Sequence, residues 1–246
     1  NLIREIRKFG LGADVVSIGE LMMALKAGID PKKIVFSGVG KTTNEISYAI
    51  DKKILLINAE SKSEIIEIEK IAKFKKKIIS IGVRLNPNTD AKTLKQISTG
   101  KKENKFGVDE KTFFALVNYS KNSKYIKLKC LSVHIGSQIL DHVPYEKMLK
   151  VINRVIKKSN HVFEFIDLGG GMGISYENNN KKLNYKKYAR AIKKFLGEHK
   201  SKIIFEPGRS IVGNVGSLIS KVIYIKENEK KDFIILDAAM NDLMRP

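Results

Sequence analysis

Short apolar segments recur along this chain, and each is separated from the next by a longer segment with helical periodicity. The apolar segments are Ala13–Val16, Ile34–Ser37, Leu55–Asn58, Ile78–Leu85, Leu131–His134, Phe165–Leu168 and Ile203–Phe205. Most are apolar throughout and do not alternate with polar residues, which is typical of parallel strands that are covered by helices. The recurrence therefore predicts a parallel β-sheet.

The segments between these strands carry apolar residues three or four positions apart, as amphipathic helices do. Examples are Glu20–Ala27, Ser63–Phe74, Lys111–Tyr119, Tyr145–Ile156 and Tyr185–Leu196. A run of strand-then-helix repeats of this length favours an α/β fold of the (β/α)8 TIM-type barrel class, with a doubly wound open sheet as the alternative. Residues 1–9 read as a helix with no strand before it, so we expect a barrel that lacks its first strand.

The alternation of predicted strands and helices ends near the C-terminus of the chain. Gly216–Ile225 and Phe233–Leu236 are two strand-like segments joined by a polar turn, with no helix between them. This pattern is typical of antiparallel strands. We therefore expect residues 1–214 to form the barrel and residues 215–246 to begin a C-terminal β domain.

The net charge of +20 raises the question of nucleic-acid binding, because clustered cations release counterions from phosphate backbones. The lysines, however, are spread over every helix and form no stripe interleaved with aromatic residues, so no nucleic-acid partner is expected. Arginine is scarce, and Arg84, Arg209 and Arg245 each adjoin an apolar strand or a turn. Because a guanidinium can bind a carboxylate or phosphate through two parallel hydrogen bonds, these three are candidate anion-binding residues.

The apolar runs are too short to span a bilayer and the N-terminus shows no signal pattern, so we expect a cytoplasmic protein without membrane contact. Cys130, the single cysteine, lies in an apolar setting and is expected to be a buried strand residue. The lysine side chains are expected to be solvated on helices and loops. His142, His161 and His199 lie in polar or helical contexts, so no metal site is expected.

Two turns follow the last two apolar segments of the predicted barrel. Gly169–Gly173 (GGGMG) comes after Phe165–Leu168, and Glu206–Arg209 (EPGR) comes after Ile203–Phe205. The loops after the last two barrel strands often bind phosphate, and glycines let backbone N–H groups approach it closely. Glycines alone would indicate only a tight turn, but the two turns together indicate a phosphate site.

Two side chains at strand ends could carry chemistry at the mouth of the barrel. The carboxylate of Glu206 could hold a pyridine nitrogen protonated, and the alternative is a surface salt bridge. His134 ends its strand and is followed by Gly136 and Ser137, which places an imidazole and a hydroxyl over the barrel mouth. A purely structural histidine is the alternative.

These residues belong to a set of motifs that resembles the pyridoxal-phosphate-dependent ornithine, diaminopimelate and arginine decarboxylases, whose barrel is alanine-racemase-like. The motifs are Phe36–Thr42, Ser98–Gly100 with Glu103–Gly107, His134–Gln138, Gly169–Gly171, Glu206–Val212, and Asp237–Asp242 with Arg245–Pro246. Variants of the glycine triplet and of the EPGR turn occur across the whole family. The other motifs resemble the diaminopimelate decarboxylase branch more narrowly.

The resemblance implies roles for the matching residues. His134 is implied to stack on the cofactor ring and Glu206 to meet its pyridine nitrogen, which makes both of them catalytic residues. The implied cofactor-binding set is His134, Ser137, Gly170, Gly171, Glu206, Pro207, Gly208 and Arg209. Arg209 and Arg245 are the implied substrate-binding residues, with Arg245 on the distal carboxylate, and the role of Arg84 stays open.

The same resemblance implies that the complete protein converts meso-diaminopimelate to L-lysine and carbon dioxide, the last step of lysine biosynthesis. It would use pyridoxal 5'-phosphate and form a homodimer with shared active sites. A decarboxylase of another basic amino acid, of the ornithine or arginine type, and a non-catalytic pyridoxal-phosphate-binding barrel are the alternatives. The family's cofactor-linking lysine and its cysteine–glutamate element have no match here, so we expect an interior fragment that is inactive by itself.

Overall fold

The chain divides into two compact units, Asn1–Ser210 and Ile211–Pro246, which are described separately. A computed structural model describes residues 2–91, 100, 105–176 and 182–243 of the chain. Both candidate turns, Gly169–Gly173 and Glu206–Arg209, lie among the described residues of the first unit.

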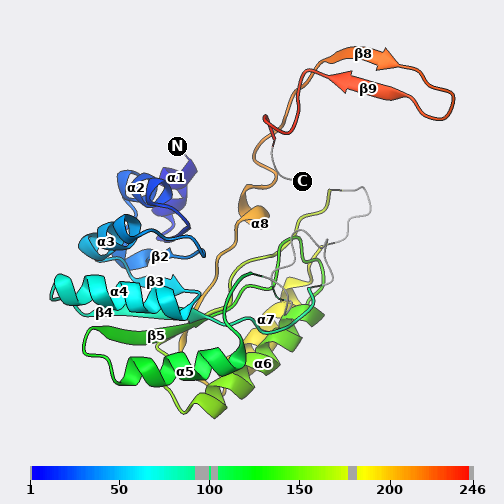
Figure 1. The fold of residues 1–246 in the computed structure, drawn as a ribbon. Coiled ribbons are helices and arrows are strands. Elements are labelled where there is room, and N and C mark those ends of the chain that lie inside the picture. Colours follow the sequence, from blue (N-terminus) through cyan, green and yellow to red (C-terminus); the bar gives the residue numbers. More distant parts are fainter. Residues whose placement is uncertain (1, 92–99, 101–104, 177–181, 244–246) are drawn as a thin grey trace. The chain divides into compact units, whose positions relative to one another are not determined.

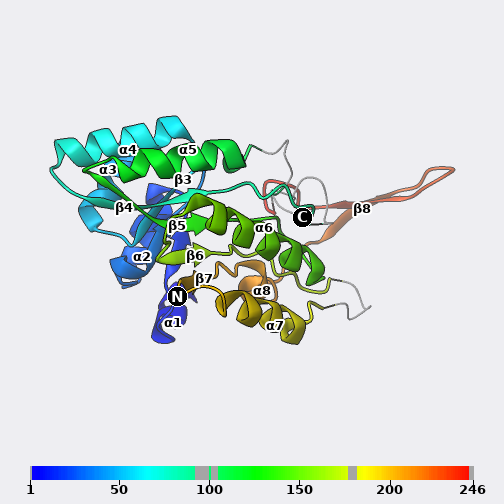
Figure 2. The ribbon, with the colours of Figure 1, turned by 90° about the horizontal axis from the view of Figure 1, so that it is seen from below.

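The first unit contains a parallel sheet whose strands pair in the order of the sequence (Figure 1). The strands are β1 (Ala13–Val15), β2 (Ile34–Phe36), β3 (Leu56–Ala59), β4 (Ile79–Arg84), β5 (Ile126–Ser132), β6 (Phe165–Asp167) and β7 (Lys202–Ile204). Every neighbouring pair in this sheet is parallel. The predicted α/β barrel class is confirmed: the seven strands curl into a half-barrel with helices on its outside (Figure 2).

Helices connect most of these strands. The connecting helices are α2 (Ile18–Lys26), α3 (Thr43–Lys52), α4 (Lys62–Phe74), α5 (Glu110–Lys121), α6 (Val143–Ser159) and α7 (Tyr185–Leu196). In addition, α1 (Leu2–Lys8) precedes β1, and a short 3-10 helix, η1 (Pro31–Lys33), precedes β2. Ser17, Thr42 and Ser61 cap their helices by accepting a hydrogen bond from a backbone N–H in the first turn. Such caps satisfy amide groups that would otherwise lack partners, which fixes where each helix begins.

Most of the strands carry apolar residues on both faces, as the sequence predicts for a covered parallel sheet. On β2, Ile34 and Phe36 belong to the large core beneath the helices, whereas Val35 belongs to a smaller cluster with Leu56, Cys130 and Phe165. The predicted burial of Cys130 is confirmed, because its side chain is 0% exposed. Burial also raises the pKa of its thiol.

Two predicted strands have different bounds in the structure. β5 begins at Ile126, five residues before the predicted Leu131, because its first half alternates and exposes Lys127 instead of being apolar throughout. In the second unit, β8 (Val222–Lys226) is shorter than the predicted Gly216–Ile225. The glycine and serine residues at its predicted start favour turns over strands.

The second unit contains an antiparallel pair, β8 with β9 (Phe233–Leu236), in which Val222 lies opposite Leu236. All residues of both strands are exposed within this unit. The short helix α8 (Arg209–Val212) lies at the boundary between the two units. The assignment of residues 215–246 to the start of a β domain stays a prediction.

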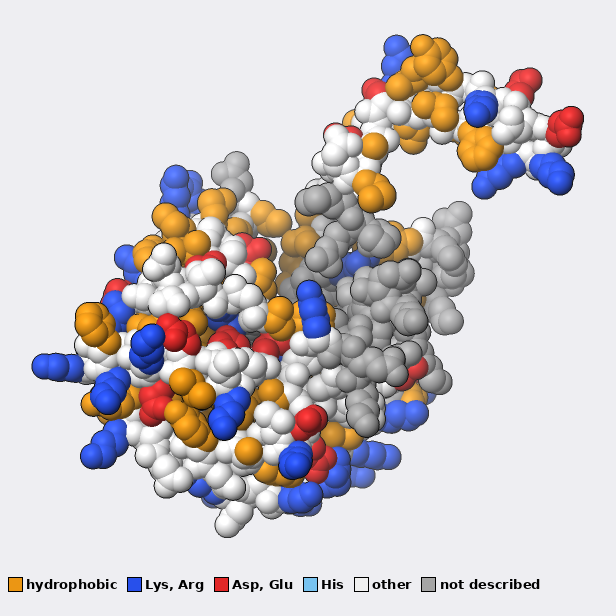
Figure 3. Space-filling model, in the orientation of Figure 1, with side chains coloured by type: hydrophobic (Ala, Val, Ile, Leu, Met, Phe, Trp, Pro, Cys, Tyr) orange, Lys and Arg blue, Asp and Glu red, His pale blue; other side chains and the backbone are white. Residues whose placement is uncertain are grey.

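Basic and acidic side chains are interspersed on the face of the first unit that Figure 3 shows. The lysines on this face form no continuous basic field among the described residues. Helices long and apolar enough to cross a membrane are not found in the described part of the chain. The absence of a nucleic-acid partner stays a prediction.

Candidate functional site

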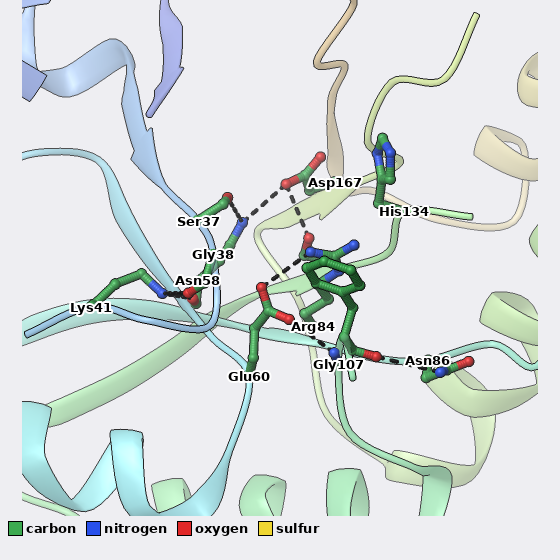
Figure 4. A network of polar contacts seen from close by, with 12 residues as sticks. Ser37, Gly38, Lys41, Asn58, Glu60, Arg84, Asn86, Gly107, His134 and Asp167 are labelled. Atoms are coloured by element: carbon green, nitrogen blue, oxygen red, sulfur yellow. Dashed lines mark hydrogen bonds and ion pairs between the residues drawn. The ribbon is translucent and has the colours of Figure 1, made fainter. Parts of the chain in front are cut away.

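The carboxyl ends of the parallel strands meet at one edge of the half-barrel, and polar side chains gather there. Ser37, Asn58, Glu60, Arg84, His134, Asp167 and Glu206 all lie at or just beyond the end of a strand. Figure 4 shows most of them pointing toward one another. In barrels this end is where the reactive groups of enzymes are found.

Asp167 is the centre of a buried hydrogen-bond network in the half-barrel (Figure 4). Its Oδ2 accepts from Asn58 Nδ2 and from Ser132 Oγ, both at 3.1 Å, and its Oδ1 accepts from Gly169 N at 2.9 Å. Asn58 Nδ2 also lies 3.3 Å from Ser37 Oγ. Burial raises the pKa of Asp167, and the hydrogen bonds oppose that rise. The network therefore fixes a carboxyl group directly beneath the glycine loop.

Glu206 lies beside this network, and one of its oxygens has no partner. Its backbone N–H donates to Gly169 O at 2.9 Å, which holds the EPGR turn against the glycine loop. Its Oε1 is buried and makes no hydrogen bond with the described residues. Burial, followed by the charges of Asp167 and Asp14, raises the pKa of Glu206 well above its ordinary value. The position therefore lacks a hydrogen-bond donor, and an N–H donor placed against Oε1 would satisfy it and favour the ionised carboxylate.

His134 is hydrogen-bonded to the glycine loop through its Nδ1 atom. The backbone N–H of Gly170 donates to Nδ1 at 3.2 Å, so Nδ1 is an acceptor and the proton of the neutral ring is on Nε2. Burial, with a smaller effect of the nearby Arg84 charge, lowers the pKa of His134 to about 4. The imidazole is therefore neutral at physiological pH, and its ring is positioned by the loop that follows β6.

The glycine loop is packed so closely that side chains would not fit. A Cβ on Gly169, whose φ is +64°, would lie 2.7 Å from Nδ1 of His134. A Cβ on Gly170 would lie 2.0 Å from the carbonyl oxygen of Glu206, and one on Gly171 would lie 2.3 Å from that of Gly136. The three glycines are thus required because the loops after β5, β6 and β7 touch through their backbones.

The loop after His134 pairs with the glycine loop. Ile139 N donates to Gly171 O at 2.9 Å, and Gly173 N donates to Ile139 O at 3.1 Å. Among the described residues, the backbone N–H groups of Gly171 and Gly208 donate to no backbone carbonyl, and Ser137 adds a hydroxyl on the loop after β5. The candidate phosphate-binding residues therefore lie on three adjoining loops and keep donors available.

Arg209 begins α8 and contacts an aromatic side chain of the glycine-loop segment. Its Nη1 lies 2.6 Å from Tyr176 Oη, and its guanidinium lies 5.6 Å from the centre of the Tyr176 ring. Tyr176 is exposed, so the pair lies at the surface of the first unit. The remaining candidate substrate residue, Arg245, lies outside the described residues.

Arg84, whose role the sequence left open, forms a partly buried ion pair at the end of β4 (Figure 4). Its Nη1 lies 3.1 Å from Glu60 Oε1, and Glu60 Oε2 accepts from Gly107 N at 2.9 Å. The guanidinium lies 4.9 Å from the centre of the Phe106 ring. Glu60 thus connects the ends of β3 and β4 to the Phe106–Gly107 turn. Its place directly after an apolar strand is the sequence signal that could have identified it.

Lys41 contradicts the expectation that the lysines are solvated. Its side chain is 0% exposed, and its Nζ donates to Glu64 Oε1 and Gly38 O at 2.6 Å and to Asn58 O at 2.7 Å. All three ammonium protons are therefore used. Lys41 joins the loop after β2, the end of β3 and the first turn of α4, so it is a structural anchor of the strand ends.

The other histidines lie away from the strand ends. His161 Nε2 lies 2.9 Å from the carbonyl oxygen of Leu128, and His199 Nε2 lies 3.0 Å from Asn153 Oδ1. Groups of three or more potential metal-binding side chains are not found among the described residues. Asp167, Asn58 and Glu60 also belong to the site, although the sequence did not indicate them as site residues.

The family model for the pyridoxal-dependent decarboxylase, pyridoxal binding domain, matches residues 1–213. Diaminopimelate decarboxylase of Aquifex aeolicus is 42% identical over 250 residues, covering 100% of this chain and 59% of that protein. The enzyme of that name from Helicobacter pylori strain J99 is 44% identical over 249 residues, covering 100% of this chain and 61% of that protein. The chain therefore spans about 60% of the length of these curated relatives.

A solved structure shows the same likeness in three dimensions. The crystal structure of Helicobacter pylori diaminopimelate decarboxylase complexed with L-lysine superposes with a TM-score of 0.92 at 43% identity. The match covers 99% of this chain and 62% of that one.

Proposed function

Since the chain belongs to the pyridoxal-dependent decarboxylases, we propose that the complete protein converts meso-diaminopimelate to L-lysine and carbon dioxide. The proposed cofactor is pyridoxal 5'-phosphate. This cofactor, when bound, supplies a protonated ring that accepts the electron pair left by the departing carboxylate. The single observation that carries the proposal is the buried Oε1 of Glu206, which lacks a donor where a pyridine N–H would supply one.

The residues around Glu206 fit a planar ring with a phosphate at one end. His134 is neutral and held by Gly170, so its ring can stack on an aromatic face without a charge of its own. Gly171, Gly208 and Ser137 offer donors on adjoining loops, which suits the oxygens of a phosphate. Pro207 restrains the turn between Glu206 and Gly208 through its fixed φ.

Glu206 is the residue to which we assign control of the ring's protonation. Its high pKa in the absence of a partner reflects burial and neighbouring carboxyl groups, chiefly Asp167. A cationic N–H against Oε1 would reverse this preference, because an opposite charge favours the ionised carboxylate. We therefore assign to Glu206 the role of holding one proton at the pyridine nitrogen and to Asp167 that of fixing the surroundings of Glu206.

We assign substrate recognition to Arg209 and Arg245. A substrate with two carboxylates needs one bidentate cation for the carboxylate that is kept, and arginine suits this geometry better than lysine. The scarcity of arginine in a chain rich in lysine supports the assignment.

We also propose that the complete protein is a cytoplasmic homodimer with shared active sites. Sedimentation analysis of the purified complete protein would test the dimer.

The test of the proposed reaction is a comparison of substrates with the purified complete protein and added pyridoxal 5'-phosphate. Carbon dioxide release should be fast with meso-diaminopimelate, and L-lysine should accumulate in equal amount. Ornithine, arginine and lysine should react at least about a hundredfold more slowly in kcat/KM, because they lack the second carboxylate. Faster release from ornithine or arginine would assign the protein to another branch, and no release from any of them would refute the decarboxylase proposal.

A further inference from the structure

Tyr145 lies beneath the glycine loop and is hydrogen-bonded to it. It belongs to the first turn of α6 and its side chain is 0% exposed. Its hydroxyl donates to the carbonyl oxygen of Gly170 at 3.1 Å, and Gly170 is itself buried. Burial raises the pKa of Tyr145, so the phenol keeps its proton and remains a donor throughout the physiological pH range.

Gly170 connects this hydroxyl to both candidate catalytic residues. The peptide group on its N-terminal side donates to Nδ1 of His134, and the one on its C-terminal side accepts from Tyr145. Its Cα packs against the backbone carbonyl of Glu206, because a Cβ there would lie 2.0 Å from that oxygen. The orientation of two successive peptide groups therefore depends on a donor that comes from a helix outside the sheet.

Tyr188 offers a natural comparison in the same cluster. It lies on α7, its ring centre is 4.5 Å from that of Tyr145, and it is 4% exposed. Its hydroxyl is buried and makes no hydrogen bond with the described residues. The two tyrosines thus share the packing environment, but only Tyr145 contacts the glycine loop through a hydrogen bond.

We propose that Tyr145 is a positioning residue for the cofactor site, acting through Gly170 on His134 and on the open N–H of Gly171. The inference rests on the proposed function, because it assigns these loop groups to the cofactor's ring and phosphate. The hydroxyl of Tyr145 holds the Gly170 carbonyl toward α6. That orientation keeps the N–H of Gly170 hydrogen-bonded to Nδ1 of His134, and it leaves the N–H of Gly171 facing away from α6.

The physical reason is that the Gly170 carbonyl is buried and needs a partner. Without the hydroxyl, this carbonyl would be unsatisfied or would rotate to find another donor. Glycine offers little resistance to such a rotation, because it has no Cβ to restrict φ and ψ. Rotation of the peptide group would move the N–H of Gly171 and strain the hydrogen bond to His134.

The test compares Tyr145→Phe with Tyr188→Phe in the complete protein, since each variant removes one buried hydroxyl and leaves the ring in place. The dissociation constant for pyridoxal 5'-phosphate, measured by equilibrium dialysis, should rise about tenfold in Tyr145→Phe, which corresponds to about 1.4 kcal/mol. It should change less than twofold in Tyr188→Phe. In the cofactor-free protein, ¹⁵N NMR of labelled histidine should show the Nδ1 signal of His134 shifted only in Tyr145→Phe.

A role in stability alone would lower the melting temperature of Tyr145→Phe and leave the dissociation constant and the His134 signal unchanged, which would overturn the inference. Equal effects of both variants would overturn it as well, because packing would then explain them. If the wild-type protein binds no pyridoxal 5'-phosphate, the proposed function fails. The His134 signal of the cofactor-free protein would still decide whether Tyr145 acts through Gly170.

Discussion

Lys41→Met should destabilise the protein strongly, because it removes a buried ammonium group whose three hydrogen bonds are all made within the first unit. The partners are Glu64 Oε1, Gly38 O and Asn58 O, at 2.6 to 2.7 Å. The side chains of Lys41 and Glu64 are 0% and 9% exposed. Methionine keeps the approximate length of the side chain, so the change tests the charge and its hydrogen bonds more than the packing.

The expected loss is about 3–5 kcal/mol, the usual cost of leaving one member of a buried ion pair without its partner. A change of 1 kcal/mol corresponds to about 2–4 °C in Tm for 150–250 residues and to less in a longer protein, so the Tm of the complete protein should fall by several degrees. Thermal unfolding followed by circular dichroism of the complete protein would measure it. The double variant Lys41→Met with Glu64→Gln should recover part of the lost stability, because it removes the unpaired charge.

The loss should also depend on pH in a defined direction. Burial raises the pKa of Glu64 above its ordinary value, and the Lys41 charge opposes that rise, so Lys41→Met should raise it further. A carboxyl with a raised pKa in the folded state contributes stability that is present below its unfolded pKa and is lost as pH rises through the folded value. The difference between Lys41→Met and wild type should therefore be smaller at pH 5 than at pH 8.

Lys157→Met is the matched control, because Lys157 forms an ion pair of similar length, 2.8 Å, with Glu198 at an exposed position. Its Tm should equal that of the wild type within error, as is usual for exposed pairs. A Tm for Lys41→Met as close to wild type as that of Lys157→Met would refute the claim that this lysine anchors the strand ends.

The remaining predictions concern the site itself. His134 should not titrate between pH 5.5 and 8 in NMR, because desolvation lowers its pKa to about 4. The stability that it contributes should be lost as pH falls from about 6.5 toward 4, and a titration midpoint near 6.5 would contradict the neutral ring. Gly171→Ala should weaken binding of pyridoxal 5'-phosphate, because its Cβ would lie 2.3 Å from Gly136 O. A Cβ at Gly40 would have no atom within 4 Å, so Gly40→Ala should bind the cofactor as the wild type does. Arg245→Lys should lower kcat/KM for meso-diaminopimelate by roughly 10- to 150-fold, since a charged bidentate hydrogen bond contributes about 1.5–3 kcal/mol; a change within about twofold would refute its assignment.

The strands, the helices and the edge of the sheet that carries the site could be predicted, because each depends on local patterns of apolar residues. His134, Gly170 and Glu206 could be proposed as site residues for the same reason: they follow apolar strands directly. The glycines were expected to let backbone N–H groups approach a phosphate, and the sequence does not show that they also pack against other parts of the protein backbone. In the structure these are the carbonyls of Glu206 and Gly136.

The rest of the site depends on contacts between distant parts of the chain. Asn58 and Asp167 are 109 residues apart and form a hydrogen bond inside the half-barrel, which no local pattern indicates. Lys41 was wrongly expected to be solvated, because lysines are mostly exposed and its burial results from the meeting of two loops with α4. Tyr145 reads in sequence as one apolar position of an amphipathic helix, and only the fold shows that its hydroxyl reaches Gly170.

The most direct test of the proposed cofactor chemistry is the turnover of Glu206→Gln, measured in the complete protein with bound cofactor quantified for each preparation. Glutamine keeps the size of the side chain but removes the carboxylate that would hold the pyridine nitrogen protonated. We expect the cofactor content to stay near that of the wild type while kcat for meso-diaminopimelate falls about a hundredfold or more, as for the loss of a key electrostatic group. A kcat within twofold of the wild type, at equal cofactor content, would contradict it and leave Glu206 as an ordinary buried acid.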